Sequence, residues 1–320
     1  MNTLPIQIPC GSAVVFAPHP DDEVLGPGGT LALHRQTGFP VHVIVLTDGA
    51  AGESRDAYAA YTAVRRAESQ RSASVLGLSE IEFWGYPDTR LTLDDALVRR
   101  IADVILAFSP AYVYLPAPLD QNPDHKTAAH ACWLAARMAC HERPGMATLL
   151  RFSEGAYPIP VNVAVDISAV IELKQRAFAE HTSQLAVRSY LDCILALHRL
   201  RAHAASVGTH AEAFLECPIT SSRGDLDQLF LHGNAEPVSD ARMDNSQSVQ
   251  WPVAVTPDGA TFSRLWEWYV CSMPAVLTRY RDALHTKNAW SADQVCAHNA
   301  VRNTRLHRIW HRIASCLGKD

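Results

Sequence analysis

The sequence predicts an α/β fold built on a doubly wound, mostly parallel sheet. Short apolar runs rich in β-branched residues alternate with longer stretches that carry apolar residues at helical spacing. Each short run also gives way to polar or turn-forming residues, as a strand does where a loop begins. Regular alternation of strand and helix is typical of a parallel sheet with helices on both faces, so we expect a Rossmann-like architecture.

Six strands and five helical segments follow from these patterns. The strands are expected at residues 13–16, 41–47, 81–84, 111–115, 148–152 and 161–166. The helices are expected at residues 30–35, 57–76, 93–108 and 126–140, and a mostly helical stretch runs from residue 168 to about residue 205. Because strand and helix alternate in order, the polar loops after the strands fall at one edge of the sheet.

Charged residues concentrate in the loop that follows the first strand, Pro18-His19-Pro20-Asp21-Asp22-Glu23. Burying three carboxylates and an imidazole together is costly unless a cation neutralises them. The loop lacks the Gly-x-Gly-x-x-Gly spacing of a phosphate-binding turn, and its charges have the wrong sign for one. The loop therefore predicts a metal site, and a solvated acidic turn is the alternative.

Composition narrows the class of protein. The chain has 320 residues, of which 48% are hydrophobic and 19% charged, as in an ordinary globular protein. A net charge of −5 argues against nucleic acid as a partner. No run approaches the ~18 apolar residues of a transmembrane segment, and the N-terminus lacks the pattern of a signal peptide. Eight cysteines without a Cys-x-x-Cys pair fit free thiols in a reducing compartment, so we expect a cytoplasmic protein.

A second polar loop, residues 116–125, follows the strand at 111–115 and ends in Asn122-Pro123-Asp124-His125. In a doubly wound sheet this strand can neighbour the first strand, which would place His125 beside His19 and Asp22. Two imidazoles and one carboxylate are a common set of zinc ligands that leaves a fourth position open. Taken alone, His125 could equally be a surface or helix-capping residue.

With these loops in view, the sequence resembles the zinc-dependent de-N-acetylases of the PIG-L (LmbE-like) family. That family includes the N-acetylglucosaminyl-phosphatidylinositol, mycothiol-pathway and bacillithiol-pathway deacetylases. The resemblance covers about residues 12–217. Its motifs, in order, are Pro18 to Glu23; Leu46 to Gly49 with Gly52; Arg65 and Glu68, then Leu76 and Gly77; Gly85 to Asp88; Pro123 to His125; and Lys174 with His181 to Gln184.

The resemblance implies removal of the N-acetyl group from an N-acetylglucosamine-type sugar or glycoconjugate. It makes His19, Asp22 and His125 the ligands of one Zn²⁺ per catalytic domain. It makes Asp21 the general base that helps a zinc-activated water to attack the amide, chemistry that is consistent with a zinc-lowered water pKa of ~7.

Three further residues match family positions, and each has a simpler alternative. Arg65 and Asp88 are implied to contact the sugar. Without the resemblance, Arg65 reads as a helix-surface residue paired with Glu68 and Asp88 as a turn former. His181 is implied to lie near the rim of the pocket, where it could supply a proton, or it could be a helix-face histidine without a role.

One departure from the family pattern concerns Asn122. Many members carry a histidine three positions before the third ligand, where it can steady the oxyanion or protonate the leaving amine. An amide can still donate a hydrogen bond to an oxyanion, but it cannot shuttle protons near neutral pH. Either Asp21 acts as both base and acid, or another group such as His181 supplies the proton.

The leading hypothesis is thus a metal-dependent N-deacetylase. Two alternatives stay open at this stage. One is a non-catalytic sugar-binding protein of the same fold, which only Asn122 favours. The other is a zinc hydrolase that acts on another small amide or ester.

Residues 218–320 lie beyond the resemblance and are expected to form an extension packed on a catalytic domain of residues 1–217. The extension begins with turn-forming residues and becomes helical in pattern from Phe262. Residues 301–317 carry one apolar stripe with interleaved arginines. We expect that helix to pack on the catalytic domain or on a second copy, which would give a homo-oligomer. A membrane-surface helix that recruits a lipid-linked sugar is the alternative.

Overall fold

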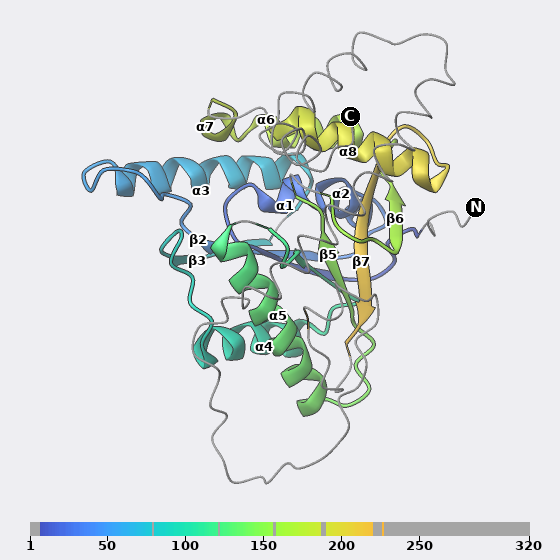
Figure 1. The fold of residues 1–320 in the computed structure, drawn as a ribbon, viewed down its shortest axis with the longest axis horizontal. Helices are drawn as coiled ribbons and strands as arrows, with labels where there is room; N and C mark the ends of the chain where they lie inside the picture. Colours follow the sequence, from blue (N-terminus) through green and yellow to red (C-terminus); the bar gives the residue numbers. More distant parts are fainter. Residues whose placement is uncertain are drawn as a thin grey trace, which may run out of the picture.

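A seven-stranded sheet forms the centre of the protein in the computed structural model, which describes residues 7–78, 80–120, 122–155, 158–186, 190–219 and 226 (Figure 1). The strand order is β3-β2-β1-β4-β5-β7-β6. The strands are β1 (Ala13–Ala17), β2 (Val41–Thr47), β3 (Glu80–Tyr86), β4 (Tyr112–Pro116), β5 (Leu149–Ser153), β6 (Val163–Asp166) and β7 (Ala211–Pro218). The pairs from β3 to β5 are parallel, and β7 is antiparallel to both neighbours. The predicted doubly wound, mostly parallel sheet is confirmed.

Helices cover both faces of this sheet. They are α1 (Asp22–Leu25), α2 (Gly28–Gln36), α3 (Tyr58–Val75), α4 (Asp95–Phe108), α5 (Pro123–Glu142), α6 (Ile171–Ala179), α7 (Thr182–Leu185) and α8 (Tyr190–Ala205). Helices α4 and α5 pack on one face, whereas α2, α3 and α6 pack on the other (Figure 1). Along β1, Phe16 points to the first layer and Val15 to the second, because successive side chains alternate across a strand. Burial on both faces explains why the strands read as continuous apolar runs.

The order of the strands creates a switch point beside β1. The chain leaves β1 for β2 on one side and returns to β4 on the other, and both pairs are parallel. In such sheets a crevice opens between the loops at the carboxyl ends of the two strands where the winding reverses. Those loops hold His19 after β1 and His125 after β4. The expected adjacency of the two polar loops is therefore present.

The structure differs from the sequence-based expectation in several elements, among them the one-turn helix α1, which has no counterpart in that expectation. The expectation contained no strand corresponding to β7, in which Glu212 and Glu216 interrupt the apolar pattern. Helix α5 starts at Pro123 and not at residue 126, so His125 lies in its first turn. The stretch from residue 168 to residue 205 is divided into α6, α7 and α8. Of the proposed extension the structure describes only residues 218, 219 and 226, so its predicted helices lie outside the described residues.

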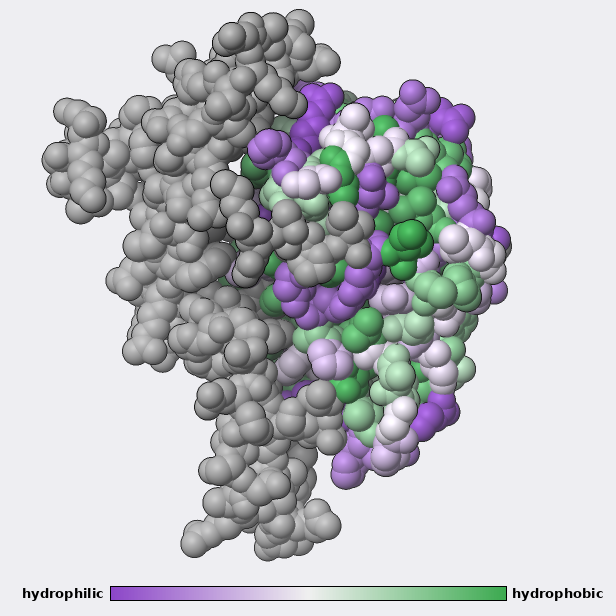
Figure 2. Space-filling view, turned by 90° about the vertical axis from the view of Figure 1, so that its right-hand side faces the viewer, coloured by the Kyte–Doolittle hydropathy of each residue, from purple (hydrophilic) through white to green (hydrophobic). Residues whose placement is uncertain are grey.

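The described surface mixes polar and apolar residues. On the face shown in Figure 2, hydrophilic and hydrophobic residues of the described part are interspersed. The large hydrophobic side chains that the described part exposes are Ile8 and Val64. Among the described helices, none has the length and apolar character needed to cross a membrane.

Helix α2, which follows the polar loop of β1, is held at its far end by the buried His34. The ring lies 2.8 Å from the Gly11 carbonyl through Nδ1 and 2.9 Å from the Tyr114 hydroxyl through Nε2. Because a carbonyl only accepts, Nδ1 carries the proton and Nε2 accepts from Tyr114. Burial lowers the pKa of His34 to about 4, so the ring is neutral at neutral pH.

Acid should destabilise the fold through this residue. Between pH 6.5 and about 4 the unfolded chain binds a proton at His34 that the folded chain excludes, so stability falls as the pH falls through that window. The shift corresponds to about 3 kcal/mol. Urea unfolding of wild type and His34→Gln across this range measures it, and the variant should lose less stability on acidification. Equal losses in the two proteins would contradict the assignment.

Candidate active site

Three side chains meet where the loops after β1 and β4 approach each other. His19 Nδ1 lies 3.1 Å from Asp22 Oδ2 and 3.2 Å from His125 Nε2. His125 Nε2 lies 3.0 Å from the same Asp22 oxygen. The His19, Asp22 and His125 side chains are 9%, 15% and 13% exposed, so the cluster is sheltered but still open to solvent.

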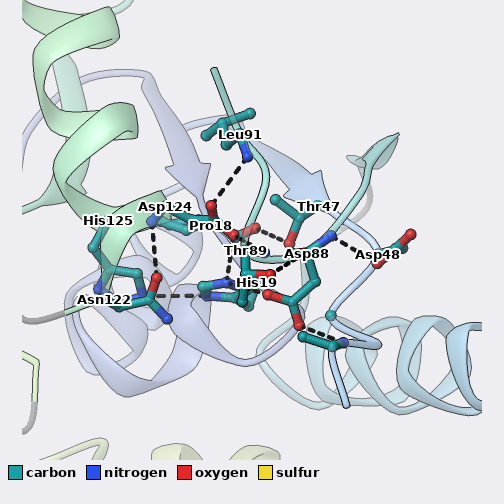
Figure 3. Close-up of polar contacts among 12 residues, drawn as sticks. Pro18, His19, Thr47, Asp48, Asp88, Thr89, Leu91, Asn122, Asp124 and His125 are labelled. Atoms are coloured by element: carbon teal, nitrogen blue, oxygen red, sulfur yellow. Dashed lines mark hydrogen bonds and ion pairs between the residues drawn. The ribbon is translucent and has the colours of Figure 1, made fainter. Parts of the chain in front are cut away.

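The outer nitrogens of both histidines face carboxylates. His19 Nε2 lies 3.1 Å from Asp88 Oδ1 and 3.2 Å from Asp124 Oδ2 (Figure 3). His125 Nδ1 lies 2.9 Å from Asp120 Oδ2. A histidine that binds a metal is neutral, and since an ionised carboxylate only accepts, the remaining proton of each ring would then belong on its outer nitrogen. The inner nitrogens then present lone pairs to each other and to the Asp22 carboxylate.

Three acceptors that converge in this way repel one another unless a cation lies among them. Their separations of 3.0–3.2 Å are close to the edge of ~3.4 Å that tetrahedral zinc with bonds of ~2.1 Å requires. A second group, formed by His19, Asp88 and Asp124, could also hold a metal. Its carboxylates already accept backbone N–H groups, Asp124 from Thr89 and Leu91 (Figure 3), which favours a supporting role.

The carboxylates around the cluster make it electrostatically negative. Burial opposes the charged form of His125, but Asp22 and Asp120 outweigh it and raise the pKa to about 10. The pKa of His19 is likewise raised, because hydrogen bonds to Asp124, Asp22 and Asp88 outweigh burial. Burial also opposes ionisation of Asp22, yet the two histidines hold its pKa well below the usual value. The site thus favours positive charge.

Asp21 sits beside the cluster in a strained conformation. Its φ of 146° lies in a region that residues with side chains seldom adopt, at a cost of ~1–3 kcal/mol. Glu23 Oε2 accepts the Asp21 N–H at 2.9 Å, and Arg65 Nη2 lies 3.2 Å from Asp21 Oδ2. Burial raises the pKa of Asp21 to about 6, and the Arg65 charge limits the rise.

Arg65 of α3 points inward and ties two loops together. Its guanidinium donates to the Gly49 carbonyl at 2.9 Å and to the Pro20 carbonyl at 2.5 Å. Gly49 has a φ of +66°, and a Cβ there would lie 2.8 Å from Arg65 Nη1, so only glycine fits. Pairing of Arg65 with Glu68, the simpler alternative, is wrong, because Glu68 instead accepts from Thr182 and Ser183.

Asp88 has both carboxylate oxygens engaged. Oδ1 faces His19, and Oδ2 accepts the Ala51 N–H at 2.9 Å. Its own N–H donates to Asp48 Oδ1 at 3.2 Å (Figure 3), and Asp48 also accepts from the Tyr58 hydroxyl. Asp88 therefore joins the β3 loop to the candidate metal cluster, and the structure does not test its predicted sugar contact.

Asn122 is the N-cap of α5. Its Oδ1 accepts the Asp124 N–H at 2.8 Å (Figure 3). Pro123 occupies the first helical position. Because the cap fixes which end of the amide faces the helix, the NH₂ group is turned away from it. That nitrogen makes no hydrogen bond to a described residue in the structure.

His181 is completely buried between α6 and α7. Neither ring nitrogen makes a hydrogen bond among the described residues, and Nε2 lies 3.7 Å from Glu23 Oε1. Burial lowers the pKa of His181 to about 4, so the ring is neutral at neutral pH. These features favour a packing role over proton donation. The predicted catalytic role remains untested.

Sequence reasoning gave no role to Asp48, Asp120 or Asp124. Asp120 and Asp124 stand in the same loop as His125, so a search for carboxylates around a ligand histidine could have found them. Asp48 is linked to the site through the Asp88 N–H, which it accepts. Because Asp48 follows β2 and Asp88 follows β3, the sequence alone does not predict that hydrogen bond.

Comparisons with known proteins agree with this geometry. Residues 14–136 match the family model described as PIG-L, GlcNAc-PI de-N-acetylase. The chain is 33% identical over 180 residues to a diacetylchitobiose deacetylase of Thermococcus kodakarensis, covering 52% of this chain and 67% of that protein. The chain belongs to the PIG-L de-N-acetylase family. The resemblance drawn from the motifs is thus confirmed.

Other relatives show what the PIG-L fold supports. The chain is 34% identical over 155 residues to a 4-oxalmesaconate hydratase of Pseudomonas putida, covering 45% of this chain and 58% of that protein. A solved structure of an N,N'-diacetylchitobiose deacetylase from Pyrococcus horikoshii has the same fold, with a TM-score of 0.57 at 24% identity over 65% of this chain and 84% of that one. The relatives of this chain are therefore named for two different reactions.

Proposed function

We propose that this chain is a metal-dependent N-deacetylase of an N-acetylglucosamine-type sugar or glycoconjugate. The observation that carries the proposal is the convergence of His19, Asp22 and His125 beside a buried Asp21. The similarity to a diacetylchitobiose deacetylase supports the substrate class.

His19, Asp22 and His125 would hold the ion, and two imidazoles with one carboxylate favour zinc. Such an ion supplies acidification of a water ligand and polarisation of the amide carbonyl. The protein residues around it do the rest of the chemistry. Asp120 and Asp124 keep the two rings in the tautomer that exposes their inner lone pairs.

Asp21 is proposed to take the proton from the attacking water and return it to the leaving amine. Asp21 lies two residues after His19 and directly before Asp22 in the chain. Its carboxylate is held by an ion pair with Arg65. We propose that Arg65 acts through Asp21, and that Asp88 acts through His19. Their contact with the sugar, implied by the resemblance, stays a prediction.

The Asn122 amide is proposed to donate to the oxyanion that develops from the carbonyl. The helix cap leaves only its NH₂ group for this task. An oriented donor of this kind stabilises a transition state without having to reorganise. Because Asn122 cannot transfer a proton, Asp21 is proposed to carry out both transfers, from the attacking water and to the leaving amine.

A hydratase is the second candidate function. The observation that favours it is the 34% identity to a 4-oxalmesaconate hydratase, as high as the identity to the deacetylase. A metal site flanked by a carboxylate base can also direct water to a carbon–carbon double bond. The position of Asn122 is compatible with either reaction.

One experiment separates these functions. The purified protein is incubated with N-acetylglucosamine, diacetylchitobiose and N-acetylglucosaminyl malate, and separately with 4-oxalmesaconate, the acid for which the similar hydratase is named. Acetate and free amine are measured for the sugars, and loss of the conjugated chromophore for the acid. We expect acetate release that stops with a chelator and returns with zinc. Turnover of the acid alone would make the protein a hydratase, and turnover of neither would favour a binding protein or a hydrolase of another amide or ester.

Replacement of the proposed base should separate metal binding from turnover. Asp21→Asn should retain the metal but lose ~10²–10⁴-fold in kcat, because general-base catalysis contributes that much. The exposed Asp95→Asn, on α4, is the matched carboxylate-to-amide control and should be unchanged. Near-normal turnover of a metal-loaded Asp21→Asn would assign the base elsewhere.

Variants of Asn122 should distinguish its capping and donor roles. Asn122→Ser keeps a cap but not the amide, so stability should hold while kcat falls by ~10²-fold. Asn122→Ala should lose, in addition, ~1 kcal/mol of stability. Asn122→His should add an alkaline limb to the dependence of kcat on pH. Equal rates and profiles for wild type, Asn122→Ser and Asn122→His would show that residue 122 faces away from the reaction.

A further inference from the structure

A buried ion pair lies behind the polar loop of β1 and has no part in the chemistry described above. Lys174 of α6 and Glu212 of β7 are each 1% exposed, and Lys174 Nζ lies 2.6 Å from Glu212 Oε1. A buried pair of this kind is costly to desolvate and is favourable only where further hydrogen bonds satisfy both partners.

Lys174 satisfies its remaining donors at the end of α1. Its Nζ donates to the Leu25 carbonyl at 2.9 Å and to the Gly26 carbonyl at 3.0 Å. Helix α1 is a single turn of four residues that begins with Asp22, and one isolated turn is not stable by itself. The ammonium group therefore supplies partners for carbonyls that the short helix leaves without one.

Glu212 holds the start of the next helix. Its carboxylate accepts the N–H groups of Gly29 and Thr30, each at 2.7 Å, and the Thr30 hydroxyl at 2.5 Å. Pro27, at the N-cap of α2, makes no side-chain cap, so Glu212 takes that role from a distant strand. A Cβ at position 29 would lie 2.9 Å from Ile167 Cγ2 and 3.0 Å from Glu212 Oε1, and these two contacts explain the glycine there.

We propose that Lys174 and Glu212 are positioning residues that set the metal affinity of the candidate site. The pair holds both ends of the connection between α1 and α2, and Asp22 is the first residue of the one-turn helix that leads into it. His125 belongs to a different helix, α5, so a movement of α1 would change the distance between the Asp22 carboxylate and the His125 ring. Neither Lys174 nor Glu212 contacts a ligand side chain in the described structure, so both act through the backbone. The inference rests on the metal set proposed above.

A purely structural role would look different from a positioning role. Arg151 and Glu216 form a second, partly buried pair that also uses β7, with Arg151 Nε 2.7 Å from Glu216 Oε2. Arg151 also contacts Tyr114 and Gln7, and not the α1–α2 turn. A variant of Arg151 should therefore lower stability without altering the ligand geometry, which makes it the matched control.

The test measures zinc affinity of metal-free protein by competition with a chelator, and the absorption spectrum of the cobalt-substituted protein. Both are measured at a temperature at which circular dichroism shows every variant folded. Lys174→Met and Glu212→Gln should each weaken zinc binding by ~10–100-fold, as the loss of outer-shell partners does, and alter the cobalt bands. Arg151→Met should lower the melting temperature but leave affinity and spectrum unchanged. Thr30→Val removes one hydrogen bond to Glu212. It should also weaken zinc binding, but by less than Lys174→Met or Glu212→Gln. It replaces those two variants in the test if they do not fold.

Two outcomes would overturn the inference. Wild-type zinc affinity in folded Lys174→Met and Glu212→Gln, or in Thr30→Val where those two do not fold, would show that the pair only stabilises the fold. Equal weakening in Arg151→Met would show that affinity follows general stability. Wild type and a His19→Ala, His125→Ala variant in the same titration test the premise separately. If these two bind zinc equally, the proposed metal set itself is wrong.

Discussion

The convergence of three hydrogen-bond acceptors at one point is the constraint on which the site depends. Such an arrangement persists in a sheltered position only if every surrounding group is held in place. The outer nitrogens of the two histidines face Asp88, Asp120 and Asp124. Asp88 and Asp124 in turn accept backbone N–H groups of neighbouring loops, and Asp120 accepts one within its own loop. The loops after β1, β2, β3 and β4 thereby become one hydrogen-bonded unit. The parallel sheet supplies the common edge at which that unit can form.

Much of this arrangement could be predicted because it depends on short stretches of sequence or on the order of strands and helices. Alternating strands and helices predict the parallel sheet, and a sheet wound in both directions brings the loop of His19 beside that of His125. Residue types then limit what the loops can bind. The Asn-Pro pair at Asn122 even contains a helix start that the sequence-based boundary placed three residues too late.

The remainder could not be predicted because it depends on pairs that are distant in the chain. Nothing near Glu212 indicates that it caps α2, 182 residues away. Arg65 has an acidic neighbour at helical spacing, yet it turns inward to the strained Asp21 while Glu68 binds α7. The partner of a buried charged residue is set by the three-dimensional fold and not by sequence spacing. The sequence alone therefore does not show whether a polar residue lies on the surface or supports the site.

The cap formed by Asn122 has a consequence for how this family can diverge. The side chain at that position begins a 20-residue helix and, in the proposed mechanism, also donates to the oxyanion, so one residue would serve both stability and chemistry. A histidine there offers proton transfer but is a poorer cap, and a protein that adopts it must recover the lost helix stability elsewhere. Selection for heat tolerance and selection for catalytic speed would therefore favour different residues at the same codon.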